Sequence, residues 1–122
     1  MKKKILIVDD DAAVRRVIRR ALQDLDCDFI EASDGSEVRE IVRRMRPAVV
    51  LLDIHMPELD GIAVTDEISR AHPDIRVIIV TGDATQMRAK LAMERGARDF
   101  VAKPIDVDYL RRTVEANLVA SG

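Results

Sequence analysis

Side chains that could take part in phosphoryl chemistry follow short apolar runs at four places in this sequence. They are the carboxylates of Asp9, Asp10 and Asp53, the hydroxyl of Thr81 and the ammonium of Lys103. Carboxylates brought together repel one another and need a proton or a cation, and a site built from oxygen ligands suits Mg²⁺. A carboxylate can act as a nucleophile, while a hydroxyl, an ammonium and a metal ion can neutralise the oxygens of a transferring phosphoryl group. The set therefore predicts Mg²⁺-dependent transfer of a phosphoryl group to Asp53.

These side chains can meet only if the apolar runs before them are strands of one sheet. Five runs are expected to form strands, at residues 5–8, 29–32, 49–52, 75–80 and 100–102. They are apolar on both faces, the pattern of a parallel sheet covered by helices on both sides. The carboxyl ends of parallel strands share one edge, where ligands bind. Asp10 and Asp53 become neighbours there if the first and third strands are adjacent.

Helical patterns alternate with these strands. The boundary signals are a capping box formed by Asp34 and Glu37, Gly61 at the start of the third helix, Gly96 at the end of the fourth helix (84–95), and Asp106 as the cap of the fifth. Right-handed crossovers make the predicted fold a doubly wound (βα)5 α/β domain with a five-stranded parallel sheet in the flavodoxin-like order 2-1-3-4-5. One face of the first helix is basic and is either solvated or a docking surface for an acidic partner; it carries Arg15, Arg16, Arg19 and Arg20.

Length and composition exclude several classes of protein. A chain of 122 residues has room for one core, so residues 1–122 are expected to form a single domain with no output domain. The 20 Lys and Arg against 22 Asp and Glu give a formal net charge of -2, and aromatic residues are scarce, so nucleic-acid binding is not expected. The first apolar run is too short for a signal peptide or a membrane span, and the single Cys27 allows no internal disulfide. A cytoplasmic location fits these features.

The motifs at the strand ends resemble those of a known family over nearly the whole chain. They are the acidic pair Asp9 and Asp10, the pattern Asp53-x-x-Met56-Pro57-x-x-Asp60-Gly61, the pair Thr81-Gly82 and the pair Lys103-Pro104. Together and in this order they are highly specific. The chain resembles the CheY-like receiver domain of two-component response regulators.

The resemblance implies a role for each carboxylate at the predicted site. Asp53 is implied as the phosphoacceptor, modified to an aspartyl phosphate. Asp9 and Asp10 are implied as the Mg²⁺ site, with Asp10 as a direct ligand, and Asp53 and the backbone carbonyl of His55 complete the ligand set. The cofactor expected from the resemblance is therefore Mg²⁺.

Further residues are implied to contact the phosphoryl group or to respond to it. Thr81 and Lys103 resemble the pair that contacts the phosphoryl oxygens, and Phe100 falls at the switch aromatic position. His55 and Asp83 fall at the two positions that set how fast water reaches the phosphoryl group. The peptide bond after Lys103 is expected to be cis, which proline permits.

By the same resemblance, the chain is a switch and not an enzyme acting on other molecules. A sensor histidine kinase or a phosphotransfer protein is implied as the donor, and the domain catalyses only its own phosphorylation and dephosphorylation. Phosphorylation favours a state in which Thr81 and Phe100 move inward, which changes the surface of the fourth helix, fifth strand and fifth helix. A downstream protein or output domain reads that surface, and the monomer can dimerise through it. Residues for a charged dimer face, which ordinary surface charge would also explain, are Asp99, Arg111 and Arg112.

Two other functions compete with this interpretation. Asp9-x-Asp11 after a strand matches the nucleophile motif of haloacid-dehalogenase-like phosphatases, but that reaction leaves Asp53 without a role and the chain has little room for a cap domain. A pseudo-receiver would keep the fold as a binding module that is never phosphorylated, and the presence of every charged site residue argues against it. Dinucleotide binding is not supported, because no Gly-x-Gly-x-x-Gly follows the first strand.

Overall fold

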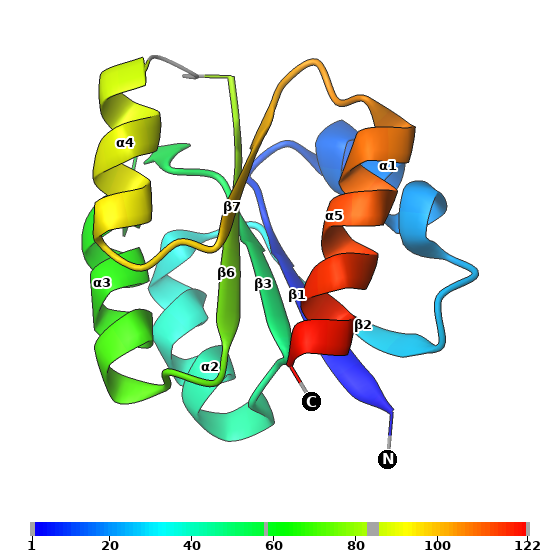
Figure 1. Cartoon of the computed structure of the whole chain (residues 1–122), viewed down its shortest axis with the longest axis horizontal. Coiled ribbons are helices and arrows are strands. Elements are labelled where there is room, and N and C mark those ends of the chain that lie inside the picture. The colour runs from blue at the N-terminus through cyan, green and yellow to red at the C-terminus, as the bar shows by residue number, and fades with distance from the viewer. Residues whose placement is uncertain (1, 58, 83–85, 122) are drawn as a thin grey trace.

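A five-stranded parallel sheet runs through the centre of the molecule in the computed structural model, which describes residues 2–57, 59–82 and 86–121 (Figure 1). Its strands are β1 (Lys3–Val8), β2 (Cys27–Ala32), β3 (Val49–Leu52), β6 (Arg76–Thr81) and β7 (Asp99–Ala102). They lie in the order β2-β1-β3-β6-β7. The predicted flavodoxin-like order is therefore confirmed, and each predicted strand differs from the observed one by two residues or fewer at either end.

The register of the strands brings the site residues to one edge. Val8, the last residue of β1, is paired with Leu52, the last residue of β3. Asp9 and Asp53 therefore leave the sheet side by side, and the ladder continues for one more bond, from the Asp53 N–H to the Val8 carbonyl at 3.1 Å. Asp9 and Asp53 are therefore close because β1 and β3 are paired, and their proximity does not depend on the conformation of a loop.

The described residues form five α-helices, which cover the two faces of the sheet (Figure 1). Helices α1 (Ala12–Leu22) and α5 (Val107–Ala120) pack on one face. Helices α2 (Val38–Met45), α3 (Gly61–Ala71) and α4 (Gln86–Glu94) pack on the other. The doubly wound prediction is confirmed. No helix among the described residues is both long enough and apolar enough to cross a bilayer.

Alternation along each strand divides the core between these two faces. Leu6 and Val8 of β1 join the core under α2, α3 and α4, whereas Ile5 and Ile7 join the core under α1 and α5. All four side chains are buried. Because each such side chain contributes roughly 1.5–3 kcal/mol when it is fully buried, the two cores hold the sheet edge in a fixed geometry.

Aspartate caps begin three of the helices, but one predicted cap is wrong. Asp11, Asp60 and Asp106 accept backbone N–H groups at the starts of α1, α3 and α5. The predicted capping box of Asp34 and Glu37 is not formed, because Asp34 accepts the N–H of Ser36 and begins a 3-10 turn (Gly35–Glu37) ahead of α2. Glu37 makes no side-chain cap.

Two short strands that were not predicted follow β3. Strands β4 (His55–Met56) and β5 (Leu59–Asp60) pair antiparallel and return the chain toward the sheet before α3 begins. Gly61 is required at this return, because a Cβ at that position would lie 2.5 Å from the Cα of Ile54. The loop after Asp53 is thereby packed directly beside the end of β3.

Candidate functional site

Three carboxylates meet at the carboxyl edge of the sheet. Asp9, Asp10 and Asp53 each offer an oxygen, and these oxygens all lie within 4.8 Å of one another. Asp9 and Asp53 are only 1% and 5% exposed, whereas Asp10 is exposed. The predicted proximity of Asp10 and Asp53 is therefore observed. Because two of these three acids are removed from water, the cluster needs nearby positive charge.

Lys103 supplies part of that charge from the end of β7. Its Nζ donates to Asp9 Oδ2 at 2.7 Å and to Asp53 Oδ2 at 3.0 Å, and its side chain is 21% exposed. Burial acts to lower the pKa of this ammonium, but the hydrogen bonds and charges of the two carboxylates outweigh burial and raise the pKa above the ordinary value of a lysine. Lys103 is therefore positively charged at neutral pH.

The donor set fits a divalent metal ion. Three carboxylates and one ammonium leave two net negative charges at the edge of the sheet. All the donors are oxygens, and the exposed Asp10 keeps one side of the cluster accessible to a hydrated ion. Asp9, Asp10 and Asp53 could hold a hard divalent metal ion without moving the strands.

Two hydrogen bonds fix the orientation of Asp53. Its Oδ1 accepts the N–H of His55 at 2.8 Å and its Oδ2 accepts from Lys103, so both oxygens of the carboxylate have a protein partner. His55 is exposed. Its backbone carbonyl belongs to β4, the short strand that follows Asp53. Asp53 is thus held with its carboxylate toward Lys103, and His55 contributes through its backbone.

Asp9 is also fixed by hydrogen bonds, one of which comes from Arg15, a contact that the sequence does not predict. Its Oδ1 accepts the N–H of Asp11 at 2.9 Å, and Asp11 itself caps α1 by accepting the N–H of Ala13. The carbonyl of Asp9 accepts from Nη1 of Arg15 at 2.5 Å. Of the two roles predicted for the basic face of α1, solvation does not describe Arg15, because only 16% of its side chain is exposed. Arg15 lies six positions after Asp9, so no local sequence pattern marks their contact.

Thr81 and Phe100 lie on neighbouring strands on the far side of β3 from β1. Thr81 is the last residue of β6 and not the first residue after it, and it is fully buried. Its carbonyl accepts the N–H of Lys103 at 3.0 Å, which joins the ends of β6 and β7. Phe100 is partly buried and packs against the core under α2, α3 and α4. Asp83, expected to influence dephosphorylation, lies outside the described residues.

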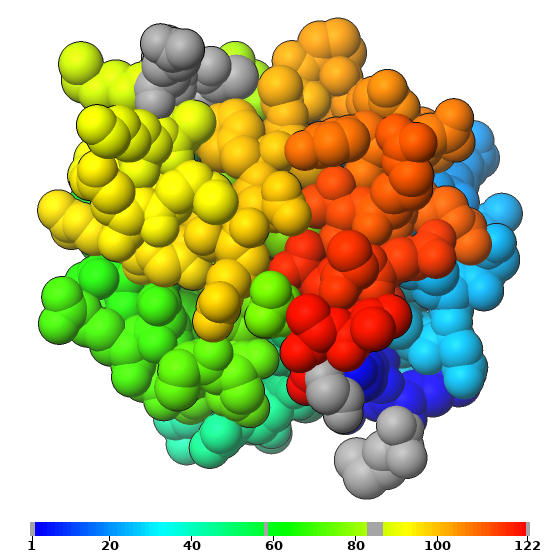
Figure 2. Space-filling view, viewed as in Figure 1, coloured from blue at the N-terminus to red at the C-terminus, as the bar shows by residue number. Residues whose placement is uncertain are grey.

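The expected switch surface is formed by α4, β7 and α5, which lie next to one another on the face shown in Figure 2. A groove of about 550 Å³ lies on it and includes Phe100, Tyr109 and Arg112 in its lining. Arg111 is paired within the chain, to Asp24 and to Glu115. The peptide bond between Lys103 and Pro104 is cis, as expected.

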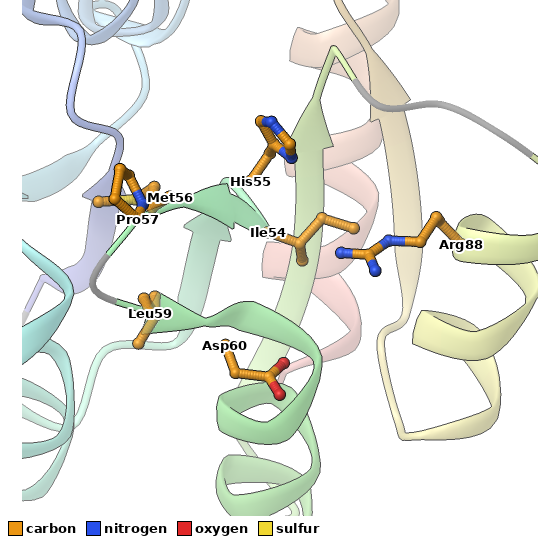
Figure 3. Close-up of a pocket in the computed structure, with 7 residues that line it drawn as sticks. All are labelled: Ile54, His55, Met56, Pro57, Leu59, Asp60 and Arg88. Carbon is orange, nitrogen blue, oxygen red and sulfur yellow. The ribbon is translucent and has the colours of Figure 1, made fainter.

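A second pocket, of about 370 Å³, lies beside the loop that follows Asp53. Figure 3 shows residues of this loop on one side, among them His55 and Asp60, and Arg88 of α4 reaching toward Ile54 from the other side. Among the residues that line it, Ile54 directly follows Asp53 in the chain, but none of the three clustered carboxylates is in the lining. The pocket therefore adjoins the loop and not the acidic cluster itself.

Comparisons with known proteins agree with this geometry. Residues 5–115 match the family model for the response regulator receiver domain. The probable transcriptional regulator ycf27 of Porphyridium aerugineum is 35% identical over 117 residues, which cover 96% of this chain and 48% of that protein. The DNA-binding transcriptional regulator NtrC of Escherichia coli (strain K12) is 37% identical over 111 residues, covering 91% of this chain and 24% of NtrC.

A solved structure is also similar to this chain in its fold. The receiver domain of NtrX from Brucella abortus superposes with a TM-score of 0.84 at 34% identity, covering 93% of this chain and 97% of that one. The chain spans about half the length of ycf27 and about a quarter of NtrC. Receiver domains work with kinases and output domains, and they are generally not enzymes acting on other substrates. With its family model, its relatives and its fold in agreement, the chain belongs to the response regulator receiver domains.

Proposed function

We propose that this receiver accepts a phosphoryl group on Asp53 from a phosphohistidine of a sensor histidine kinase or a phosphotransfer protein. One observation carries the proposal. The carboxylate of Asp53 lies at the end of a buried strand and is contacted there by Lys103, with the acidic pair Asp9 and Asp10 beside it. A nucleophile, a cation and a metal-binding pair at one point are what transfer to a carboxylate requires.

The step is a direct displacement at phosphorus. An oxygen of Asp53 forms a new O–P bond while the P–N bond of the donor breaks, and the departing imidazole nitrogen takes up a proton from water. The hydrogen bond from the His55 N–H and the contact with Lys103 hold the carboxylate in a fixed orientation for attack. As the group transfers, Lys103 and the hydroxyl of Thr81 are proposed to contact the phosphoryl oxygens.

Mg²⁺ is the metal ion that fits the proposed role. Asp9, Asp10, Asp53 and the carbonyl of His55 would hold it, and the bound ion would supply positive charge to the phosphoryl oxygens. Within this set Asp9 and Asp53 are already fixed by hydrogen bonds to the chain, so they need little ordering when the ion binds. Asp10 is the exposed member and would meet the ion from the solvent side.

The proposed output is a population shift of the surface formed by α4, β7 and α5. Thr81 would move toward the phosphoryl group and Phe100 would turn inward, which would change the groove that Phe100 lines. A downstream protein or output domain would read the change, and two phosphorylated copies could pair through the same surface. The names of the relatives, which are transcriptional regulators, favour an output in transcription.

The remaining assignments follow from the same role. Residues 1–122 would act as one receiver unit in the cytoplasm, where the kinase domain of a sensor presents its phosphohistidine. The protein would catalyse only its own phosphorylation and dephosphorylation. Contact with nucleic acid or a membrane is not part of the proposed function of these residues, whose formal net charge is -2.

Intact mass spectrometry after incubation with phosphoramidate tests this function. We expect one phosphoryl adduct on the wild type in Mg²⁺, none in EDTA and none on Asp53→Asn. The phosphatase alternative predicts that Asp9→Asn and not Asp53→Asn abolishes the adduct. Absence of an adduct on the folded wild type, with a cognate kinase as well as with phosphoramidate, would establish a pseudo-receiver instead.

A further inference from the structure

Arg15 joins helix α1 to both the acidic loop and strand β2. Its Nη1 donates to the carbonyl oxygen of Asp9 at 2.5 Å, and its Nε donates to Glu31 Oε1 at 3.1 Å. One guanidinium therefore bridges the loop that carries two of the three clustered carboxylates and the second-last residue of the neighbouring strand. A guanidinium is suited to such a bridge, because its Nε and Nη1 are donors held at fixed positions in one plane.

The atom that Arg15 contacts has a direct geometric consequence for Asp10. The carbonyl of Asp9 belongs to the same planar peptide unit as the N–H and Cα of Asp10. Fixing that carbonyl therefore fixes the Asp10 Cα and the direction of its N–Cα bond, so only rotations about φ and χ1 remain to place the Asp10 carboxylate. Asp10 needs this restraint more than its neighbours, because it is exposed, whereas Asp9 and Asp53 are buried and hydrogen-bonded through their carboxylates.

The rest of the Asp9 backbone is tied to the same strand. The Asp9 N–H donates to the carbonyl of Ala32 at 3.2 Å, and Ala32 follows Glu31, the anchor of Arg15. The peptide units on both sides of Asp9 are thus held to the end of β2, one directly and the other through Arg15. Without Arg15, the second of these units loses its link to the strand.

We propose that Arg15, anchored by Glu31, is a positioning residue that holds the Asp9–Asp10 peptide so that the Asp10 carboxylate faces the metal site. The proposal rests on the metal site of the proposed function. Arg15 touches neither the metal nor the phosphoryl group in this role. It acts through the backbone of the acidic loop.

The charge of Arg15 and its proposed positioning role predict opposite changes in metal affinity when Arg15 is replaced. Arg15 is a cation beside a cation-binding cluster, so removing its charge alone should tighten metal binding. Loss of the restraint on Asp10 should weaken it, by roughly tenfold if Arg15 acts like other residues that orient metal ligands. The direction of the change therefore separates a positioning role from an electrostatic one.

Arg19 is a matched control for Arg15. It lies one turn further along α1 and donates to the other oxygen of the same glutamate, Glu31 Oε2, at 2.9 Å. It also stacks over the ring of Phe29 at 5.1 Å. The described contacts of Arg19 include none with the Asp9 carbonyl. Replacing Arg19 thus removes the same charge and an ion pair to the same partner while leaving the acidic loop held.

Mn²⁺ binding followed by electron paramagnetic resonance tests the proposal, because it reads metal affinity without any phosphoryl transfer. We expect the Kd to rise roughly tenfold in Arg15→Gln and to stay unchanged in Arg19→Gln. Arg15→Lys keeps the charge but offers one donor nitrogen in place of the two separate nitrogens that contact Glu31 and the Asp9 carbonyl, so its Kd should lie between those of the wild type and Arg15→Gln. Glu31→Gln weakens the anchor and should raise the Kd without altering Arg15.

Two further readouts separate the possible failures. In the metal-free protein, the backbone amide resonances of Asp10 and Asp11 should shift in Arg15→Gln and not in Arg19→Gln, while urea unfolding verifies that both variants are folded. Saturating Mg²⁺ should restore the phosphorylation rate of Arg15→Gln. Equal or tighter Mn²⁺ binding by folded Arg15→Gln would overturn the positioning role and leave the proposed function intact. Failure of the wild type to bind Mn²⁺ would overturn the metal site itself and this proposal with it.

Discussion

Two lysines at opposite edges of the sheet make comparable contacts with different consequences (Figure 1). Lys3 begins β1 at the edge where the chain termini lie, and its Nζ donates to the Leu118 carbonyl at 2.6 Å and to Ser121 Oγ at 2.9 Å. Lys103 follows β7 at the other edge, and its Nζ donates to Asp9 at 2.7 Å and to Asp53 at 3.0 Å. Each lysine therefore makes two hydrogen bonds to residues distant in the sequence.

The difference lies in the charge of the acceptors. The acceptors of Lys3 are neutral groups at the carboxyl end of α5, the Leu118 carbonyl and the hydroxyl of the C-cap Ser121, where a cation also complements the helix dipole. The acceptors of Lys103 are two buried carboxylates that repel each other. At the edge with the termini a lysine completes a helix end, whereas at the other edge a lysine offsets the repulsion within the acidic cluster proposed to bind the metal ion. The comparison implies that the functional edge is held together against its own electrostatics.

Removing Lys103 should produce the largest effect. Lys103→Met leaves Asp9 and Asp53 buried without their cation, and breaking such a pair by removing one partner costs about 3 kcal/mol. The expected result is a loss of about 3 kcal/mol in the free energy of unfolding at neutral pH in EDTA, measured by urea denaturation. Since a divalent ion can replace the missing charge, Mg²⁺ should stabilise Lys103→Met more than it stabilises the wild type. Equal stabilisation of both proteins by Mg²⁺ would show that Lys103 and the metal do not act on the same carboxylates.

The stabilisation by Lys103 should also depend on pH. Burial acts against the charged form, but the bonds to Asp9 and Asp53 outweigh it and raise the folded-state pKa above 10.5. A raised pKa means that the contribution of the charge is complete below the unfolded-state value and is lost as the pH rises through the folded-state value. The stability difference between the wild type and Lys103→Met should therefore be constant from neutral pH to pH ~9 and decrease above pH ~10.5. A difference that shrinks already between pH 7 and 9 would contradict the raised pKa.

The sequence predicts the strands and the carboxyl edge because both depend on patterns that span few residues. The apolar run from Val49 to Leu52 is buried on both faces, and its end at Asp53 is unambiguous. Once the parallel order is assumed, register places Asp9 beside Asp53 without further information. The site carboxylates and Lys103 can therefore be grouped from the amino-acid sequence alone.

Features that depend on tertiary contacts could not be predicted in the same way. Arg15 looks like any exposed helical arginine in the sequence, since its partners Asp9 and Glu31 become neighbours only after β1, β2 and α1 pack. The capping box at Asp34 was predicted from spacing alone, but the chain forms a 3-10 turn there and the side chain bonds to Ser36 instead. The short pairing of β4 with β5 depends on the close packing of Gly61 against Ile54.

Replacing the other lysine should have a smaller effect and none on the site. Lys3→Met removes the two hydrogen bonds at the carboxyl end of α5 and a favourable interaction with the helix dipole, for an expected loss of about 1 kcal/mol in the free energy of unfolding. The Mn²⁺ affinity of Lys3→Met should match that of the wild type. The hydrogen bonds described for Lys3 go to Leu118 and Ser121, at the edge of the sheet away from the acidic cluster. A change in metal affinity in Lys3→Met would mean that α5 transmits disturbance from one edge to the other, and the contrast between the edges would fail.

Asp10→Asn should give the smallest change in stability, and with the opposite sign. Asp10 is the exposed member of the cluster, so replacing it removes repulsion from Asp9 and Asp53 without leaving a buried group unpaired. Near the surface this relief is expected to raise the free energy of unfolding by about 0.5 kcal/mol in EDTA, while the Mn²⁺ affinity falls. The gain should decrease with added salt, because screening weakens repulsion between exposed charges.

A loss of stability instead would show that Asp10 supports the fold of the acidic loop, and the functional edge would then differ from the opposite edge less than the two lysines suggest. A gain in stability together with a loss of metal binding would identify Asp10 as a residue retained for binding at the expense of the fold.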